Sequence, residues 1–479
     1  MNSQVKGVDF ADVQGIVRFA HGHLKGASYL LLTVKDPQSA RAWLRDAPIT
    51  DAVESLPLAS SAMHVAFTAS GLRAVGVPEA AVAQFSPEFL QGVGGEDDRS
   101  RRLGDVGANA PQYWTWGNVD REPHVLVALF AAPEALDAFV VRVRTPLWDR
   151  AFASIAELGT SDLYGFEQFG FTDGISQPQI DWQQQLELRG DKPAYGNVVA
   201  LGEVLLGYRN EYDRYTDRPL LSTGGVNDLL LPAEDDASKR DLGRNGTYLV
   251  LRDLLQDVRA FWSFAKTETI ASAFVGRTPK GESLVQTGND QNDFTFAQDP
   301  DGTRCPFGAH IRRANPRNGD FSSVPSGPIA TLLAMLGFGK QRFQDDITSS
   351  VRFHRIVRRG REYGLPLAPS DATLPAPADD PARGLRFVCL NANIGRQFEF
   401  LQSAWFASSK FNGLVGESDP LLGNREPGPN GESTDAFVMN RADAARTRLT
   451  GLPQFVTVTG GAYFFLPGLS ALRYISQSA

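Results

Sequence analysis

The stretch His124-Val-Leu-Val-Ala-Leu-Phe130 is an apolar run of strand length, and Pro133-Glu-Ala-Leu-Asp-Ala-Phe-Val-Val-Arg-Val-Arg144 follows it closely. The second run has the apolar spacing of an amphipathic helix, and it begins with proline, which is favoured at the first position of a helix. The two runs together predict a strand followed by a helix that packs on it.

The same strand-then-helix pattern recurs on both sides of this stretch. Further pairs are expected at 29–34 and 39–45, 64–68 and 72–75, 247–252 and 253–266, and 385–390 and 394–406. The last of these helices has Asn393 as its capping residue. Near the C-terminus, apolar runs at 455–458 and 462–466 predict a hairpin across Gly460 and Gly461.

Strand–helix units combined with hairpin-like strands favour an α+β fold of two ferredoxin-like halves over a parallel, doubly wound sheet. We expect these halves at residues 1–240 and 241–479. The segments 365–383 and 416–434, rich in Pro and Ala or in Gly and Pro, are expected to be surface loops.

Composition excludes several classes of function. The chain has 479 residues and a formal charge of −8, which argues against a nucleic-acid or anionic-membrane partner. No run of about 18 apolar residues predicts a membrane span. Cys305 and Cys389 are too few for a disulfide framework or a cysteine-rich metal site. Neither HExxH, GxSxG nor a GxGxxG after a strand occurs, so zinc hydrolase, serine hydrolase and dinucleotide-binding interpretations lack support.

The N-terminal segment has no basic start followed by an apolar stretch and no twin arginine. The expected location is therefore the cytoplasm for the chain as written, or outside the cell if a leader was removed.

An acid between glycines is the first candidate for chemistry. It is Asp173 in Gly170-Phe-Thr-Asp-Gly174, within the longer stretch 164–178, where Phe166, Phe169 and Phe171 surround it. Aromatic neighbours exclude water, and a carboxylate in a dry site is costly unless it has a partner or a task. Taken alone, the stretch is more typical of a packed turn, because Asp-Gly is a common turn sequence.

The second candidate is a histidine followed by arginines, in Cys305-Pro-Phe-Gly-Ala-His-Ile-Arg-Arg-Ala-Asn-Pro-Arg317. A haem needs an imidazole below its iron and cations for its two propionates, so His310 with Arg312, Arg313 and Arg317 makes chemical sense. The spacing supports a haem site and a basic surface turn about equally.

The third candidate is Arg355-Ile-Val-Arg-Arg-Gly-Arg-Glu-Tyr-Gly364, which carries four arginines in an acidic protein. A solvated basic loop is the usual meaning of such a charge run. Ile356 and Val357 nevertheless form an apolar strand face just before Arg358, which favours an inward direction for that side chain.

These three stretches together resemble the dye-decolourising peroxidases. The family's GxxDG signature matches 170–174, its histidine stretch is similar to 306–317 and its arginine strand is similar to 355–364. Weaker similarities lie at Phe85-Ser-Pro-Glu-Phe-Leu-Gln91, Gly202-Glu-Val-Leu-Leu-Gly-Tyr208, Phe398-Glu-Phe-Leu-Gln402 and Gly460-Gly-Ala-Tyr-Phe-Phe-Leu-Pro467. The family fold, two ferredoxin-like halves in a barrel-like arrangement, agrees with the α+β interpretation.

The resemblance implies an enzyme, a haem peroxidase with haem b (iron protoporphyrin IX) as cofactor. It would reduce hydrogen peroxide and oxidise dyes, phenols or similar aromatic donors by one electron at a time. Site residues then follow by position: His310 as axial iron ligand, Asp173 as acid and base, Arg358 as charge stabiliser, Arg317 at a propionate, and Gly174, Ile175 and Gln177 at the cofactor. Bulky donors would react at a surface aromatic residue, for which Trp262, Trp405 and Tyr363 are candidates.

One departure from the family concerns the support of His310. Relatives often place an acid near the start of the helix after the strand at 385–390, but here the segment is Asn391-Ala-Asn-Ile-Gly-Arg396. A carbonyl, Asn391 or a water is expected in its place.

Two other functions stay open. One is a haem-binding or haem-transfer protein without peroxidase turnover, and the other is a non-haem module whose arginine strand holds an anionic ligand. The sequence indicates no oligomeric state.

Overall fold

The structure is a computed structural model, and it describes residues 7–95, 97–188, 196–285, 291–317, 351–428 and 430–478. Its centre is a nine-stranded sheet with the order β10-β12-β9-β15-β2-β3-β1-β4, in which β11 also pairs with β12. Every paired neighbour in this sheet is antiparallel. The predicted α+β class is therefore confirmed, and a parallel doubly wound sheet is excluded.

The strands of this sheet are β1 (Gly26–Val34), β2 (Ser61–Phe67), β3 (Val125–Ala131), β4 (Phe152–Gly159), β9 (Thr247–Gln256), β10 (Val357–Arg358), β11 (Arg361–Tyr363), β12 (Gly384–Asn391) and β15 (Val456–Leu466). Three small pairs lie outside it: β5 (Gln179–Asp181) with β6 (Val198–Ala200), β7 (Leu220–Ser222) with β8 (Lys239–Asp241), and β13 (Phe437–Met439) with β14 (Thr447–Leu449).

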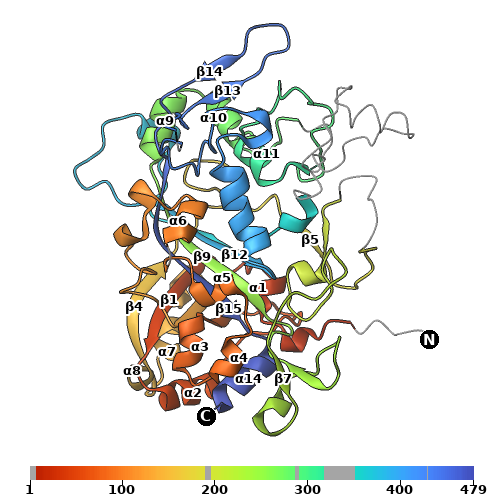
Figure 1. Cartoon of the computed structure of the whole chain (residues 1–479). Helices are drawn as coiled ribbons and strands as arrows, with labels where there is room; N and C mark the ends of the chain where they lie inside the picture. The colour runs from red at the N-terminus through yellow and green to blue at the C-terminus, as the bar shows by residue number, and fades with distance from the viewer. Residues whose placement is uncertain are drawn as a thin grey trace, which may run out of the picture.

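The helices are α1 (Gly15–Arg18), α2 (Pro37–Asp46), α3 (Ala69–Ala74), α4 (Glu79–Val82), α5 (Pro87–Gln91), α6 (Asp97–Leu103), α7 (Pro133–Val143), α8 (Trp148–Ala151), α9 (Val258–Ala265), α10 (Glu268–Val275), α11 (His310–Ala314), α13 (Pro369–Ala372) and α14 (Leu469–Gln477). Two π-helical segments, η9 (Gly395–Glu399) and η10 (Leu401–Phe406), occupy the stretch predicted as one helix at 394–406. In Figure 1, α2, α7, α8 and α14 gather at the lower end and α9, α10 and α11 at the upper end.

The strand order repeats within the sheet. The first four strands lie in the order β4-β1-β3-β2, with α2 after β1 and α7 after β3. The later strands lie in the order β15-β9-β12-β10, with α9 after β9 and the π-helical segments after β12. Each set is a βαββαβ unit with the same neighbour relations, which agrees with the ferredoxin-like prediction. The boundary between residues 240 and 241 remains a prediction.

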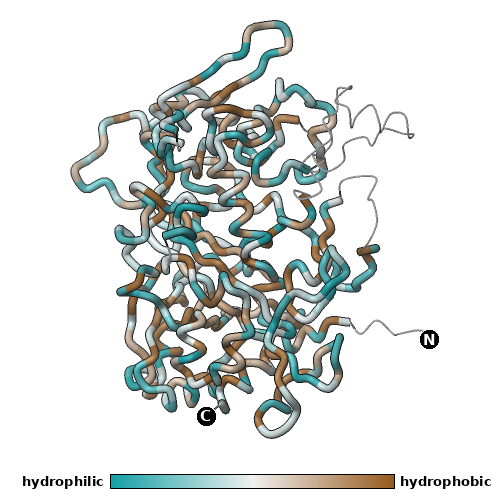
Figure 2. Tube along the Cα trace, viewed as in Figure 1, coloured by the Kyte–Doolittle hydropathy of each residue, from teal (hydrophilic) through white to brown (hydrophobic). Residues whose placement is uncertain are grey.

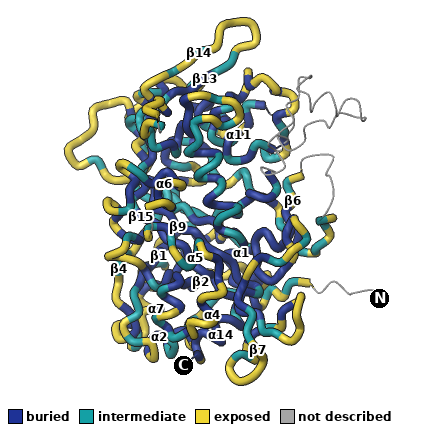
Figure 3. The backbone as a smooth tube through the Cα atoms, viewed as in Figure 1, coloured by how far each residue is buried: buried dark blue, intermediate teal, exposed yellow. Residues whose placement is uncertain are grey.

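Side chains that point alternately to the two faces of the sheet form a hydrophobic core on each face. In β1, Leu30 and Leu32 belong to the core beneath the helices, whereas Tyr29 and Leu31 belong to the core on the other face of the sheet. Successive side chains of a strand point to opposite faces, so the near-continuous apolar run in β1 reflects burial on both sides. The Ser161 amide donates to Glu362 O at 2.8 Å and so links the two edges of the sheet, as a barrel-like arrangement requires. Figure 3 shows the buried backbone concentrated along the central strands.

Local capping explains where the predicted helices begin. The carboxylate of Asp36 accepts the Ser39 amide at 2.7 Å, and Pro37 occupies the first turn of α2. The Asn393 side chain accepts the Arg396 amide at 2.8 Å, as expected for the cap of the second-half helix. These caps satisfy amides that have no partner inside the helix.

The predicted hairpin across Gly460 and Gly461 is wrong. β15 runs unbroken from Val456 to Leu466, with a register shift against β9 between Val458 and Gly460. A Cβ atom on Gly460 would lie 2.5 Å from the Trp116 ring, and one on Gly461 would lie 2.9 Å from Arg252 Cδ. The glycines therefore permit close packing on a bulged strand, which resembles a turn signal in the sequence.

The expected helix at 253–266 begins too early. Residues 253–256 continue β9, because this segment pairs with β12 on one side and β15 on the other. The helix α9 starts at Val258, where Asp257 caps the Ala260 amide at 2.8 Å.

Among the described residues no helix is long and apolar enough to cross a membrane. Along the coloured part of the trace in Figure 2, hydrophilic and hydrophobic residues are interspersed at short intervals.

Candidate active site

A partly open cavity of about 260 Å³ lies where the Asp173 loop, α11, the arginine strand and the π-helical segments meet. Its walls are largely apolar, and the apolar lining includes Leu254, Val275, Leu385, Phe387, Phe398, Leu401, Phe406, Leu421, Leu422, Val456 and Val458. His310, Asp173 and Arg358 all line this cavity. The structure thus brings the three sequence motifs to one place, although 185 residues separate Asp173 from Arg358.

The Asp173 loop owes its path to two glycines and to bonds on both sides of the acid. Gly170 and Gly174 have φ values of 90° and 80°, a region in which other residues are strained. The Asp173 amide donates to Gly165 O at 3.0 Å, and the Thr172 amide and hydroxyl donate to Pro279 O at 3.0 and 2.9 Å. The turn predicted around Asp173 is therefore also the device that presents its carboxylate to the cavity.

Arg358 forms an ion pair with this acid. Its Nη1 lies 2.8 Å from Asp173 Oδ1, and the two side chains are about 30 % exposed, which reflects their position at the cavity wall. The side-chain amide of Gln177 holds the backbone of Arg358. Its Oε1 accepts the Arg358 N–H at 3.0 Å, and its Nε2 donates to Arg358 O at 3.2 Å. Arg358 is thus held at both its main chain and its guanidinium.

The pKa of Asp173 lies below its ordinary value of 3.8. Burial acts to raise this pKa, but the charge of Arg358, the Gly174 amide, the Arg358 hydrogen bond and the charge of His310 together outweigh it. Asp173 is therefore a carboxylate at neutral and mildly acidic pH.

His310 is the first residue of α11 and also lines the cavity. Its Nδ1 lies 3.0 Å from Asp419 Oδ2 and 3.2 Å from Oδ1, and its ring stacks on Phe406 at 5.2 Å between centroids. A carboxylate can only accept, so Nδ1 carries the proton and Nε2 is the nitrogen left to bind a metal.

Asp419 corrects two expectations. The residue that holds the His310 ring is Asp419, and not a carbonyl, Asn391 or a water as expected. The segment 416–434 is also not wholly a surface loop, because Asp419 within it is fully buried. Its Oδ1 also accepts the amides of Leu421 and Leu422 at 2.9 and 2.8 Å. Burial acts to raise the pKa of Asp419, but His310, Arg313 and the Leu422 amide lower it below 3.8.

Buried guanidinium groups line the cavity beside the Asp173 loop. Arg317 donates to the carbonyls of Asn292 and Phe294, and Arg277 donates to two carbonyls and to Ser176 Oγ. Burial and the neighbouring Arg317 and Arg358 lower the pKa of Arg277 to about 10. This crowding of positive charge fits an anionic ligand in the cavity.

The remaining predicted residues take different positions. Ile175 lines the cavity, Gly174 shapes the loop, and Gln177 contacts the backbone of Arg358. Of the aromatic residues proposed for surface oxidation, Trp262 and Trp405 are buried, which contradicts a surface role for them. Tyr363 is half-buried beneath Arg386, whose guanidinium lies 3.6 Å from the ring centre.

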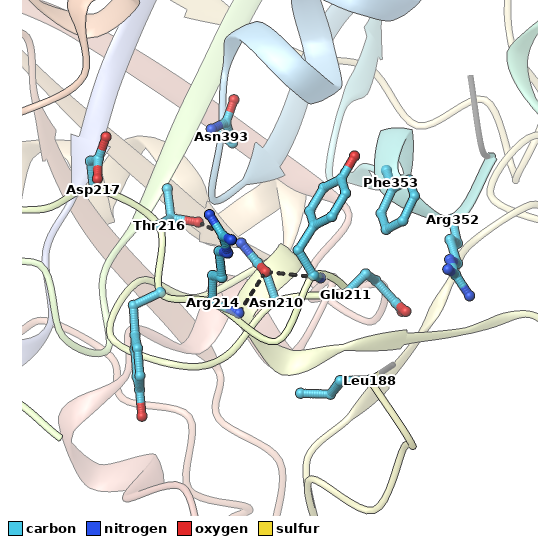
Figure 4. A pocket seen from close by; sticks show the side chains of 11 residues that line it. Leu188, Asn210, Glu211, Arg214, Thr216, Asp217, Arg352, Phe353 and Asn393 are labelled. Carbon is cyan, nitrogen blue, oxygen red and sulfur yellow. Dashed lines mark hydrogen bonds between the residues drawn. The ribbon is translucent and has the colours of Figure 1, made fainter. Parts of the chain in front are cut away.

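A second hollow of about 760 Å³, open to solvent, lies between the segment 210–217 and the side chains of Arg352 and Phe353 (Figure 4). Its lining is mixed: polar side chains such as Asn210, Glu211 and Arg352 lie beside apolar and aromatic ones such as Leu188 and Phe353. None of the site residues predicted from the sequence lines this second hollow.

The fold and the cavity define the chain as an α+β protein in which an imidazole and an acid–guanidinium pair line one largely apolar cavity. No protein-family model matches the chain. It is 26 % identical to dye-decolorizing peroxidase msp1 of Mycetinis scorodonius, over 99 % of this chain and 88 % of the relative. It is 29 % identical to the multifunctional dye peroxidase DyP2 of an Amycolatopsis species, over 64 % of this chain and 61 % of the relative.

The solved structures agree in fold. A DyP-type peroxidase of Auricularia auricula-judae superposes with a TM-score of 0.71 at 22 % identity, over 98 % of this chain and all of that chain. The chain is thus similar in sequence to curated dye-decolourising peroxidases, and it shares the fold of a solved DyP-type peroxidase, in agreement with the resemblance of its three motifs.

Proposed function

We propose that this protein is a haem peroxidase that reduces hydrogen peroxide and oxidises aromatic donors such as dyes or phenols. The observation that carries the proposal is the single cavity lined by His310 from α11 and by the Asp173–Arg358 pair. Peroxide cleavage at a haem iron requires an imidazole to hold the iron, an acid to move a proton and a cation to stabilise charge, and these three groups line this cavity.

The residues present fit a haem. Nε2 of His310 would bind the iron while Asp419 holds the ring through Nδ1. Arg317 and Arg277 would meet the propionates of haem b, and the apolar walls would cover the porphyrin, with Ile175 among them. When bound, the haem would supply the iron that holds peroxide and the redox chemistry that the side chains lack.

Asp173 would move the proton. Its lowered pKa keeps it ionised, so its carboxylate takes a proton from one peroxide oxygen. It would then return that proton to the other oxygen, which leaves as water when the O–O bond breaks. The two electrons that this cleavage consumes belong to the redox chemistry that the bound haem would supply. An Asp that starts this cycle ionised works over the whole pH range above its own titration.

Arg358 would stabilise negative charge on the departing oxygen. Its guanidinium is fixed before the reaction by Asp173 and, through the backbone, by Gln177. A preorganised cation of this kind stabilises developing charge without reorganisation.

The test is peroxide reduction by the haem-loaded protein with a phenolic donor, in the parent and in Asp173→Asn. We expect the variant to keep haem and to lose roughly 100-fold or more in rate, because positioned acid–base groups contribute about that factor. A parent that binds haem but does not turn over peroxide would favour the haem-binding or haem-transfer alternative. A parent that binds no haem would favour the anion-binding module.

A further inference from the structure

Glu167 lies in the same loop as Asp173, six positions before it, and its half-buried side chain lines the same cavity. Asp173 is the acid of the proposed mechanism, whereas nothing in that mechanism uses Glu167. An ionisable group kept at a cavity wall calls for an explanation, since its charged form loses hydration there.

The bonds of Glu167 close the loop on itself. Its Oε1 accepts the Phe171 amide at 3.0 Å, and its Oε2 accepts the Phe169 amide at 3.0 Å. The backbone adds two more bonds, from the Glu167 amide to Phe171 O at 2.8 Å and from the Gly170 amide to Glu167 O at 2.9 Å. One residue therefore fixes the chain from 167 to 171.

A second set of contacts ties this closed loop to the rest of the fold. Gln256, the last residue of β9, donates from Nε2 to Glu167 Oε2 at 2.9 Å, and its own amide donates to Arg383 O at 2.9 Å. From α9, Trp262 Nε1 donates to Phe169 O at 3.1 Å. The loop is thus anchored to the central sheet through the Glu167 carboxylate.

We propose that Glu167, together with Gln256, is a positioning residue that holds Asp173 where its carboxylate meets Arg358 and the cavity. Asp173 is only two residues beyond Phe171, so the two amides that Glu167 fixes determine where the acid begins its turn. The inference rests on the proposed function of Asp173.

The state of the carboxyl supports this role. Burial raises the pKa of Glu167 to about 7, against the lowering effect of the Phe169 and Phe171 amides and of Gln256. In the described part of the chain, Gln256 Oε1 has no hydrogen-bond partner. If the Gln256 side-chain amide rotates by half a turn, its Oε1 can accept a hydrogen bond from a protonated Glu167. The Gln256–Glu167 hydrogen bond therefore persists in both protonation states of Glu167.

Glu362 provides a matched control. It is a carboxyl in β11 whose pKa burial also raises to about 7, and it too feels the charge of Asp173. The Phe169 and Phe171 amides, however, donate to Glu167. A variant at Glu362 removes a comparable ionisable group and leaves the loop bonds in place.

The experiment compares Glu167→Ala, Gln256→Leu, Glu362→Gln and Asp173→Asn in the haem-loaded protein. The first readout is hydrogen exchange, followed by mass spectrometry of peptides covering 166–173. The second is the pH profile of peroxide reduction, whose acid limb belongs to Asp173. Gln256→Leu removes only the hydrogen bond from Gln256 to the Glu167 carboxylate. It replaces Glu167→Ala as the test variant if Glu167→Ala does not fold.

We expect Glu167→Ala to exchange about tenfold faster or more in this segment, as the loss of hydrogen bonds implies. Its acid limb should move up by about one pH unit, because a displaced Asp173 loses part of its pairing with Arg358. Gln256→Leu should show both changes in smaller degree, and Glu362→Gln neither. Near the titration of Asp173 both glutamates are neutral, so a missing charge would not produce the shift.

Faster exchange with an unmoved acid limb would overturn the proposal, since the loop would then be free to move without consequence for the acid. Equal shifts in Glu167→Ala and Glu362→Gln would also overturn it. If Asp173→Asn keeps full peroxide reduction, the proposed function of Asp173 fails, whatever the glutamate variants do.

Discussion

Asp173 and Arg358 illustrate how opposing effects of similar size set the state of one side chain. Loss of hydration at the cavity wall raises the pKa of the acid, and Arg358, the Gly174 amide and His310 lower it by more. The result is a carboxylate that is ready to take a proton and a guanidinium that is already oriented.

Arg358→Leu is expected to keep haem and to react with peroxide about 100-fold more slowly, since loss of a preorganised charge stabiliser costs about 3 kcal/mol. Stopped-flow measurement of the reaction with peroxide checks this. Arg361→Lys, three residues along the same segment and bonded to the carbonyls of Ala20 and His21, is the control and should react at the parent rate. An unaltered rate in Arg358→Leu would remove Arg358 from the mechanism.

The Asp173–Arg358 pair also sets the pH dependence of peroxide reduction. Because the pKa of Asp173 is below 3.8, peroxide reduction should persist until the pH falls below that value. In Arg358→Leu the largest lowering influence is gone, so the acid limb should move upward. A limb at the same pH in parent and variant would show that another group controls it.

At the scale of elements, the support of His310 comes from a turn rather than from a helix. Asp419 holds the imidazole and also caps the amides of Leu421 and Leu422, so one buried carboxylate orders the turn and orients the α11 histidine. A ligand held in this way keeps one tautomer and one ring orientation.

Asp419→Ala should therefore weaken haem retention about 10- to 100-fold, the usual cost of losing a partner of a metal-binding histidine. Transfer of haem to an excess of a second haem-binding protein measures this. Asp435→Ala is the control, because the side-chain hydrogen bonds of this second acid go to Ser433 and to the Gly451 amide, whereas the His310 ring contacts Asp419. Equal haem loss from the two variants would contradict the role of Asp419.

The sequence predicted the α+β class, the helix caps and the three motifs that meet at the cavity. It did not predict Asp419, because 109 residues separate it from His310 and its neighbours Gly416 and Pro420 are typical of a surface loop. The available signal was an acid just before the apolar pair Leu421–Leu422. Gly460 and Gly461 led to the wrong prediction of a hairpin for a related reason. Close packing against Trp116 and Arg252 requires glycine, and a tight turn favours glycine as well.

At the scale of the molecule, the cavity draws on the whole chain. The Asp173 loop and Asp105 come from the first half of the sequence, and His310, Arg358 and Val456 from the second. The two strand units share one sheet through the pairing of β2 with β15, where Phe67 lies opposite Phe465. The two-half organisation remains a proposal that this topology supports.

Two carboxyls with raised pKa values, Glu167 at the cavity and Glu362 in β11, should also shape stability. Glu167 and Glu362 titrate near 7 in the folded chain and near 4.5 in the absence of the fold. Between these values the unfolded chain binds fewer protons, so the free energy of unfolding should fall as pH rises from about 4.5 to 7. Glu362→Gln should reduce this fall by about 1 kcal/mol, after allowance for partial solvent screening. Denaturant unfolding across this pH range checks the sign, and a fall of unchanged size in the variant would contradict it.

The most direct test of the account is the visible absorption of the purified protein from haem-sufficient cells, compared with His310→Ala and His354→Phe. His354 lines the same cavity, but its Nδ1 lies against Arg396 O and its ring stacks on Phe400, so phenylalanine can replace it. We predict a Soret band in the parent, a bleached or shifted band in His310→Ala and an unchanged band in His354→Phe. A colourless parent, or an unaltered band in His310→Ala, would contradict the central claim that this cavity holds a haem on His310.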